Sequence, residues 1–388
     1  MKLLLEMLAM TNQCNMRCSY CDWEKEKYVL LSEEQYKVAY ENLEAVKEKL
    51  LEKYSDIVIV QYSGGEPLLY PELLFKVLKL FPDKWIRVNT NGTLLTDEIM
   101  NKVKQHGKTY LAVSLDGYSY EPNKTRFGNN KSQYEQVINN IDKVIQNRIP
   151  LMILCTLNRE NIEYFPEFVE ILSQKYKDAI NAGMLVMPTH AVTSYSVDNG
   201  AATKDQVAEF VRFIENSIDK YAILGNIREH YRNLLSYLTN GQRLYKCSIY
   251  DWALSVHFRG NHIIDDGKFL SFGCGMRGVH ELGEFNVNDM NDMALLDKAV
   301  GDYKKERFDG KIELDNQISE KNLLNDKCEN KCFPDWVVFD LIFNNQMSLE
   351  DAKKWFVIFQ DEHFENICQD YIMNKKKEFE YENIEKLS

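Results

Sequence analysis

Short apolar runs alternate with longer amphipathic segments from the amino terminus to about residue 190 of this 388-residue chain. A short apolar run bounded by turn residues is typical of a buried strand, and an apolar stripe with helical spacing is typical of a helix packed on a sheet. Repeated strand–helix units build a parallel sheet covered by helices. The six runs predicted as strands are Leu3–Met10, Ile57–Tyr62, Trp85–Asn89, Tyr110–Leu115, Leu151–Leu157 and Met184–Met187.

Six strand–helix units are fewer than the eight that close a complete barrel. The sequence therefore predicts an α/β fold, an open partial (β/α)6 barrel over residues 1–200. Residues 201–245 are predicted to form a helical connector, and residues 341–388 a charged helical tail. Within a cysteine-bearing segment, 246–340, the predicted β-hairpin is formed by Val256–Phe258, His262–Ile264 and Lys268–Phe272 and turns at Asp265-Asp266-Gly267, because Asp-Gly favours a tight turn.

Three cysteines follow the first apolar run, spaced as Cys14-Asn-Met-Arg-Cys18-Ser-Tyr-Cys21. Three thiolates can bind an iron–sulfur cluster at three of its four irons and leave the fourth open for chemistry. Zinc is the alternative, but its structural sites take four nitrogen or sulfur ligands. No His lies among residues 1–105, so zinc would have to recruit a distant fourth ligand. The spacing favours the cluster.

Motifs of glycine and polar residues follow three of the predicted strands: Ser63-Gly64-Gly65-Glu66-Pro67, Asn89-Thr90-Asn91-Gly92 and Ser114-Leu115-Asp116-Gly117. Ligands of parallel sheets bind at the carboxyl ends of the strands, where these motifs lie. Together with the cysteines and the aromatic Tyr20, the motifs resemble the radical S-adenosylmethionine (AdoMet) superfamily over residues 1 to about 190. The resemblance implies a [4Fe–4S] cluster and the reductive cleavage of AdoMet to a 5′-deoxyadenosyl radical, which takes a hydrogen atom from the substrate.

The resemblance also implies how the first two motifs bind AdoMet. Gly64 and Gly65 have no side chains, so their backbone can approach the methionyl group closely. Glu66 is expected to accept a hydrogen bond from the ammonium group of AdoMet. Asn91 is expected to line the same pocket.

By the same resemblance, the third motif and a following arginine complete the cofactor site. Ser114 and Asp116 are expected to bind the ribose hydroxyls or the ammonium end of AdoMet, with Ser114 favoured. Arg126 corresponds to an arginine that pairs with the methionyl carboxylate, an interaction suited to the planar guanidinium group.

The cysteines after residue 246 resemble the auxiliary-cluster extension called SPASM, or its shortened form called twitch. A full SPASM extension needs about seven cysteines for two clusters, whereas five are present here. One auxiliary [4Fe–4S] cluster is therefore implied, with Cys328 and Cys332 on adjacent turns if they are helical. The assigned ligands are Cys247, Cys274, Cys328 and Cys332, with Cys368 as an alternative ligand.

Cys155 lies in the predicted strand Leu151–Leu157. A thiol that faces the barrel lumen could return a hydrogen atom to a substrate radical, as an epimerase requires. Free buried cysteines more often fill a core. The sequence favours core packing and leaves the catalytic role open.

Composition narrows the class of protein. Nine cysteines without a signal-peptide pattern indicate reduced thiols that bind metal rather than disulfides. A net charge of −12 argues against a broad nucleic-acid footprint. No apolar run approaches the roughly 18 residues that span a bilayer. We therefore expect a cytoplasmic protein with neither nucleic-acid nor membrane partners.

Enzymes of this superfamily with auxiliary clusters mostly modify ribosomally made peptides, so the resemblance implies a peptide maturase. Such an enzyme forms a thioether or carbon–carbon cross-link or inverts a stereocentre. The alternative is a twitch-type enzyme that dehydrogenates or rearranges a small metabolite. Redox sensing without AdoMet cleavage is disfavoured by the strand-end motifs. Expected partners are a precursor peptide, a reductant such as flavodoxin or ferredoxin, and a separate leader-binding protein.

Overall fold

The computed structural model describes most of the chain up to residue 187 and parts of the remainder. The described residues are 2–7, 13–21, 44–45, 47–54, 56–187, 206, 209, 213, 216–217, 220–224, 254–258, 269–273, 281–286 and 289–304. Most of the predicted connector and the whole predicted tail lie outside these residues. The same holds for Cys247, Cys274, Cys328, Cys332 and Cys368.

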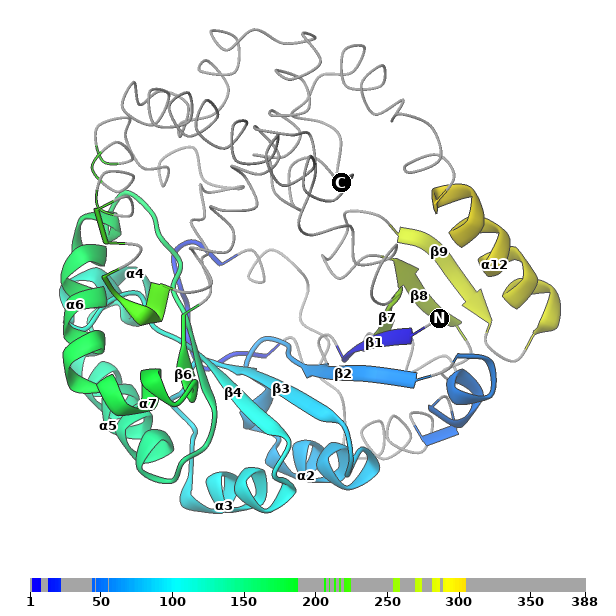
Figure 1. Cartoon of the computed structure of the whole chain (residues 1–388), viewed down its shortest axis with the longest axis horizontal. Helices are drawn as coiled ribbons and strands as arrows, with labels where there is room; N and C mark the ends of the chain where they lie inside the picture. The colour runs from blue at the N-terminus through cyan, green and yellow to red at the C-terminus, as the bar shows by residue number, and fades with distance from the viewer. Residues whose placement is uncertain are drawn as a thin grey trace, which may run out of the picture.

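One curved sheet organises the described residues (Figure 1). Its strands run in the order β6-β5-β4-β3-β2-β1-β7-β8-β9. The strands from β6 to β7 in this order pair in parallel with their neighbours. Strand β8 pairs antiparallel with both β7 and β9. The strands are β1 Lys2–Met7, β2 Asp56–Tyr62, β3 Trp85–Thr90, β4 Thr109–Ser114, β5 Leu151–Leu154, β6 Leu185–Val186, β7 Leu254–Phe258, β8 Phe269–Gly273 and β9 Glu281–Asn286.

All six predicted barrel strands are confirmed, and they are parallel as expected. The structure adds β7 to the same sheet, because Leu3 of β1 pairs with Leu254 of β7. Strands are present at two of the three runs of the predicted hairpin, Val256–Phe258 and Lys268–Phe272, and these strands, β7 and β8, pair antiparallel. Its middle run and its turn lie outside the described residues.

One predicted strand end needs correction. The first predicted strand is described over Lys2–Met7, and its last residues, 8–10, lie outside the described residues. The fifth strand ends at Leu154, not Leu157. After Leu154, Thr156 donates its backbone N–H to the side chain of Asp116 rather than to a neighbouring strand, at 2.8 Å. Cys155 therefore follows β5 and lies at its carboxyl end.

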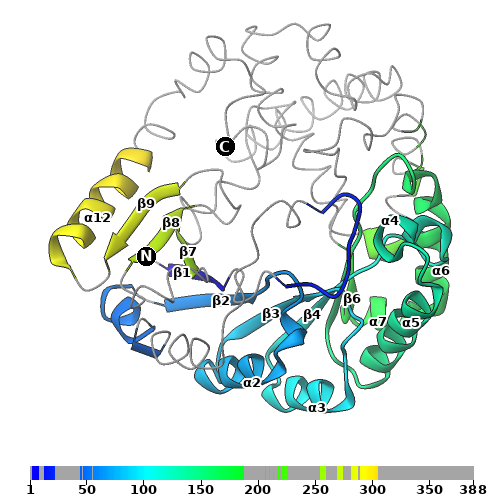
Figure 2. The ribbon, with the colours of Figure 1, turned by 180° about the vertical axis from the view of Figure 1, so that it is seen from behind.

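Helices cover the convex face of the sheet, as Figures 1 and 2 show from opposite sides. They bury apolar side chains against the strands; Leu74, Val77 and Leu172 are fully buried, for example. The covering helices are α2 Pro71–Leu80, α3 Asp97–His106, α5 Lys131–Gln146 and α6 Phe165–Lys175.

Local sequence explains where these helices begin and end. The hydroxyl of Thr96 accepts the N–H of Ile99 at 3.2 Å and caps α3, as the motif Thr96-Asp97-Glu98 predicts. Gly107 ends α3 in a left-handed conformation with φ of 74°. In α5 the residues Tyr134, Val137, Ile141 and Val144 are buried at helical spacing. The strand ends are thereby held on a rigid scaffold.

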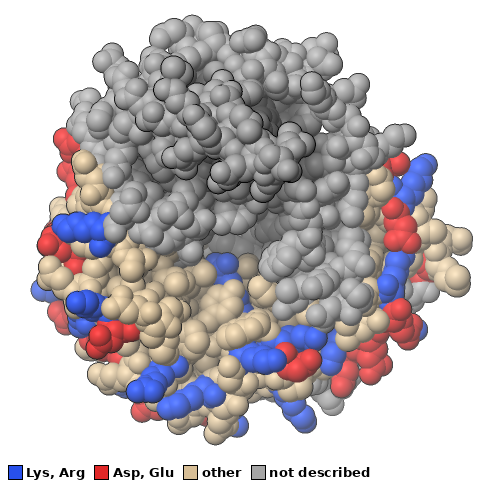
Figure 3. Space-filling model, in the orientation of Figure 1, with Lys and Arg blue, Asp and Glu red and all other residues tan. Residues whose placement is uncertain are grey.

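Figure 3 shows basic and acidic side chains interspersed over the described part of one face. In the part of the chain that the structure describes, no helix has both the length and the apolar character needed to cross a membrane.

Candidate active site

The loop that carries the three cysteines, residues 13–21, lies against the carboxyl ends of the central strands. At its start, Glu66 after β2 donates its backbone N–H to the carbonyl of Gln13 at 2.7 Å. Near its end, Ser19 donates its N–H to the carbonyl of Thr125 at 2.8 Å. The loop therefore bridges the segments that follow β2 and β4.

Cys14 is held by an amide network that begins at the end of β3. The side-chain nitrogen of Asn91 donates to Asn15 Oδ1 at 2.8 Å and lies 3.8 Å from Cys14 Sγ. Asn15 in turn donates to the hydroxyl of Thr93 at 2.8 Å, and that hydroxyl donates to Asn91 Oδ1 at 2.6 Å. We call Asn15, Asn91, Thr93 and the supporting Glu66 the amide anchor.

Within this anchor, Glu66 supports Asn91 through buried hydrogen bonds. Its carboxylate is completely buried and accepts hydrogen bonds from the N–H of Asn91 at 2.7 Å, the hydroxyl of Thr90 at 2.8 Å and the N–H of Leu68 at 3.0 Å. Burial raises the pKa of Glu66 to about 7 against the effect of these donors. Glu66 therefore ties the end of β2 to the end of β3, and its contact with an AdoMet ammonium group stays a prediction.

The second half of the cysteine loop is held by a buried ion pair. Arg126 donates to Asp116 through Nε at 3.2 Å and through Nη2 at 3.0 Å. The hydroxyl of Tyr20, between Cys18 and Cys21, donates to Asp116 Oδ2 at 2.8 Å, and the guanidinium of Arg126 lies 5.5 Å from the centre of the Tyr20 ring. We call Tyr20, Asp116 and Arg126 the ion-pair anchor.

The carboxylate of Asp116 has all its acceptor positions in use. Its two oxygens accept four hydrogen bonds, two from Arg126, one from Tyr20 and one from the N–H of Thr156. An ionised carboxylate offers about four lone-pair sites. The predicted contact of Asp116 with AdoMet would have to displace one of these donors and stays a prediction.

The turn between Asp116 and Arg126 is fixed by Asn123. Its side chain accepts the N–H of Asp116 at 2.9 Å and donates to the carbonyls of Gly117 and Ser119 at 2.7 and 2.8 Å. A Cβ on Gly117 would lie 2.3 Å from the ring of Pro122, so only glycine allows this approach. The motif Ser114–Gly117 thus presents the short helix α4, Lys124–Phe127, which carries Arg126.

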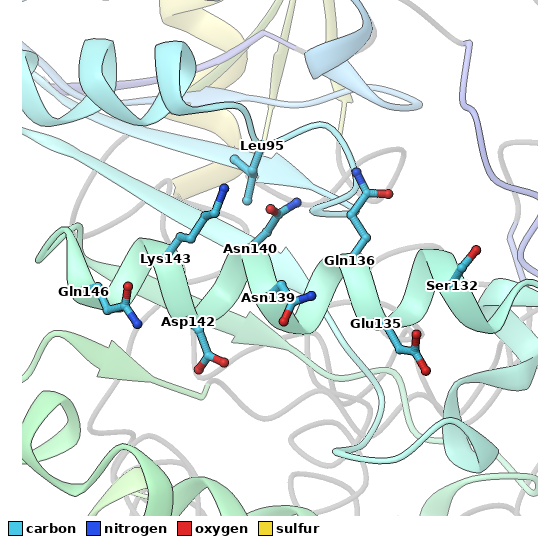
Figure 4. Close-up of a pocket in the computed structure, with 9 residues that line it drawn as sticks. All are labelled: Leu95, Ser132, Glu135, Gln136, Asn139, Asn140, Asp142, Lys143 and Gln146. Carbon is cyan, nitrogen blue, oxygen red and sulfur yellow. The ribbon is translucent and has the colours of Figure 1, made fainter.

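The amide anchor is also braced from the helix side. Asn140 and Gln136 of α5 donate to the carbonyls of Gly92 and Thr93 at 2.8 and 2.9 Å. Both line a hollow of about 760 Å³ on the outer surface, bounded by α5 and Leu95 (Figure 4). Of the side chains that line this hollow, Asn140 and Gln136 hold the turn at Gly92 and Thr93.

The comparison with family models decides the identity of this region. Residues 8–172 match the model described as the radical SAM superfamily. This matched segment is the radical SAM domain of the chain. The match begins before the cysteine loop and includes every strand-end motif discussed above.

The donors of the radical SAM domain fit an iron–sulfur cluster. Cys14, Cys18 and Cys21 are partly buried thiols outside any disulfide, and Cys14 Sγ accepts the N–H of Met16 at 3.4 Å. Burial raises the pKa of Cys14, and it raises that of Cys18 to about 11 although Arg126 opposes the shift. Cluster binding must therefore displace thiol protons. In the described residues, no three His, Cys, Asp or Glu side chains are grouped to hold a single metal ion.

The remaining predicted site residues also lie near this edge of the radical SAM domain. Gly64 and Gly65 are partly exposed after β2, and Ser114 is partly exposed at the end of β4. Cys155 is buried with 2% of its surface exposed, and burial raises its thiol pKa well above the usual range. These observations agree with a core position for Cys155 and leave its catalytic role a prediction.

Sequence reasoning missed several residues that hold the cysteine loop. Asn15, Thr93 and Asn123 were not singled out, and Tyr20 was noted only as an aromatic residue of the cysteine motif. A usable signal existed for Thr93, a polar residue directly after the Asn89-Thr90-Asn91-Gly92 motif. The partners of these residues are set by the tertiary fold, which the local sequence does not reveal.

Two archaeal sequence relatives match less than half of this chain. An uncharacterized protein of Archaeoglobus fulgidus is 31% identical over 165 residues, which are 42% of this chain and 37% of that protein. The Fe-coproporphyrin III synthase of Methanosarcina barkeri is 26% identical over 168 residues, 43% of this chain and 40% of that enzyme. The chain thus spans about two fifths of the length of these relatives.

A solved structure resembles the chain over a longer range. The structure of native anSMEcpe with bound AdoMet and the Cp18Cys peptide aligns with a TM-score of 0.56, at 16% identity, over 95% of this chain and 99% of that chain. At this identity the similarity shows a shared fold. It includes the parallel sheet whose strand ends carry the cysteine loop.

Proposed function

We propose that this chain cleaves AdoMet reductively and directs the resulting radical to a ribosomally made precursor peptide. The product is a thioether or carbon–carbon cross-link or a related modification of the peptide. The observation that carries the proposal is the shared fold with anSMEcpe, whose structure holds AdoMet and a peptide. A cluster on Cys14, Cys18 and Cys21 would supply the electron that splits a sulfur–carbon bond of AdoMet.

The residues of the domain bind and orient in this proposal. Asp116 uses only two of the five N–H donors of Arg126, so the guanidinium keeps donors for the AdoMet carboxylate. Arg126 is 7% exposed, and a carboxylate bound there would be largely shielded from water. Ser114 and Asn91 are proposed to contact the rest of AdoMet from the adjacent strand ends.

One auxiliary [4Fe–4S] cluster on Cys247, Cys274, Cys328 and Cys332, with Cys368 as alternative, remains part of the proposal, as do the domain boundaries at 200, 245 and 340. A flavodoxin or ferredoxin is the proposed electron donor. A separate leader-binding protein is the proposed further partner.

A small-metabolite substrate is the second candidate. The observation in its favour is the 26% identity with an Fe-coproporphyrin III synthase over 168 residues, 43% of this chain. A twitch-type dehydrogenation or rearrangement would use the same AdoMet site with a different substrate pocket.

The experiment that separates these functions measures AdoMet cleavage with each class of substrate. The anaerobically reconstituted full-length chain is supplied with reductant, AdoMet and either peptides encoded beside the gene or iron coproporphyrin. We expect 5′-deoxyadenosine to accumulate in proportion to a hydrogen loss seen in the peptide mass. Stimulation by the porphyrin and by none of the peptides would contradict peptide maturation.

A further inference from the structure

The two halves of the cysteine loop contact different parts of the sheet. Cys14 and Asn15 meet Asn91 and Thr93 after β3. Tyr20, which stands between the other two cysteines, meets Asp116 after β4. In the described residues no hydrogen bond joins the amide anchor to the ion-pair anchor.

We infer that Tyr20 is a positioning residue whose hydroxyl, through Asp116, fixes Cys18 and Cys21 independently of Cys14. The geometry supports a rigid attachment. Asp116 is completely buried, and Arg126 and the backbone of Thr156 hold it from two other elements. A charge held in this way is a fixed acceptor for the hydroxyl of Tyr20.

The aromatic ring of Tyr20 is held at the same time as its hydroxyl. The Arg126 guanidinium lies 5.5 Å from the ring centre, within the range of a cation–π contact. One residue back, Ser19 donates its N–H to the carbonyl of Thr125, the neighbour of Arg126. Backbone, ring and hydroxyl of this half of the loop thus all attach to the segment from Asp116 to Arg126.

The amide anchor provides the matched opposite case. Thr93 is 2% exposed, and its hydroxyl links Asn15 to Asn91, whose side-chain nitrogen lies 3.8 Å from Cys14 Sγ. Removing one hydroxyl from each anchor therefore perturbs one half of the loop at a time. Thr93→Val and Tyr20→Phe make these two deletions with little change in shape.

The consequence concerns where the three cysteine thiols point before any cofactor binds. A loop attached at both halves presents all three sulfurs in a restricted arrangement. If either attachment is lost, part of the ligand set becomes mobile while the rest stays in place. This inference uses the cysteine loop only and does not depend on the substrate.

The experiment labels each cysteine separately in the full-length chain. The iron-free protein is treated with iodoacetamide under anaerobic conditions, and labelling at Cys14, Cys18 and Cys21 is followed by peptide mass spectrometry. In Tyr20→Phe we expect Cys18 and Cys21 to react on the order of tenfold faster, the effect of losing a hydrogen bond to a charged group, with Cys14 unchanged. In Thr93→Val we expect the opposite pattern.

Tyr118→Phe is the control. Tyr118 directly follows the motif that contains Asp116, but its hydroxyl contacts Tyr176 and Lys175, outside the cysteine loop. Its variant should label like the wild type at all three cysteines. In the reconstituted protein, Tyr20→Phe should also alter the electron paramagnetic resonance spectrum recorded with AdoMet, which Tyr118→Phe should not.

Equal acceleration at all three cysteines in Tyr20→Phe, or no acceleration at any, would overturn the inference. If Tyr20→Phe fails to fold, Thr93→Val decides, because independence requires that it leave Cys18 and Cys21 unchanged. The labelling needs neither cluster nor peptide. The labelling result can therefore be interpreted even if the chain does not modify peptides. A failed labelling prediction would likewise leave the proposed peptide modification untouched.

Discussion

The two anchors each hold one half of the cysteine loop, but through different kinds of interaction. The amide anchor is a chain of neutral side chains supported by a buried carboxylate, Glu66, that has no basic partner in its hydrogen bonds. The ion-pair anchor places a permanent positive charge, Arg126, on the buried Asp116. The stability that the amide anchor provides should therefore depend on pH. The stability that the ion-pair anchor provides should be lost when one of its two charges is removed.

Removing one charge of the ion-pair anchor should have the largest effect on stability. Asp116→Asn leaves the Arg126 guanidinium buried without an anion, which should lower the free energy of unfolding by about 3–5 kcal/mol in urea denaturation. The double variant with Arg126→Met removes both charges and should recover a large part of that loss. A double variant no more stable than Asp116→Asn would contradict an electrostatic origin.

The amide anchor should make stability depend on pH. The pKa of Glu66 is about 7 in the folded chain and near 4.5 when unfolded, so between these values the folded state keeps a proton that the unfolded state has released. Stability should therefore fall as pH rises from about 4.5 to about 7, by about 3 kcal/mol from this group.

Glu66→Gln is the control for this pH effect. The glutamine does not titrate, so the difference in unfolding free energy between wild type and variant should change across that window and be constant above it. A difference that is independent of pH between 4 and 8 would mean that Glu66 ionises normally despite its burial.

Backbone geometry next to the amide anchor should give a smaller effect. Gly92 has φ of +79°, and an added Cβ would lie 2.8 Å from Val113 Cγ1, whereas Gly107 has φ of +74° with no atom within 4 Å of an added Cβ. Gly107→Ala should lower the unfolding free energy by about 1 kcal/mol, and Gly92→Ala by about 2–3 kcal/mol. Equal losses in thermal or urea unfolding would show that Val113 relaxes without penalty.

The sequence predicted the barrel well because its signals are local. Each of the six predicted strands is a short apolar run, and α3 is marked by the Thr96 cap and by Gly107 at its end. The parallel pairing of β7 with β1 had no such signal, because Leu254 and Leu3 are far apart in the sequence and meet only in the folded sheet. The hairpin pattern predicted strands at Val256–Phe258 and Lys268–Phe272 but no pairing with the barrel sheet.

The site was predicted at the level of motifs but not of contacts. The cysteine spacing and the motifs around Glu66, Asn91 and Asp116 identified the correct edge of the sheet, because the ends of parallel strands converge there. The spacing of the motifs did not show which polar groups form hydrogen bonds with one another. Asp116 was expected to meet the cofactor, yet its acceptor positions are filled by Arg126, Tyr20 and Thr156.

The central claim is that Cys14, Cys18 and Cys21 form the cluster site at which AdoMet is cleaved. The most direct test compares the reconstituted wild type with the Cys14→Ala, Cys18→Ala, Cys21→Ala triple variant, by the electron paramagnetic resonance of the reduced protein with AdoMet and by 5′-deoxyadenosine formation. We predict that AdoMet changes the wild-type spectrum and is cleaved, and that the triple variant keeps its circular dichroism but loses both responses. A wild type that holds zinc on these thiols, or a triple variant that still forms 5′-deoxyadenosine at the wild-type rate, would contradict the account.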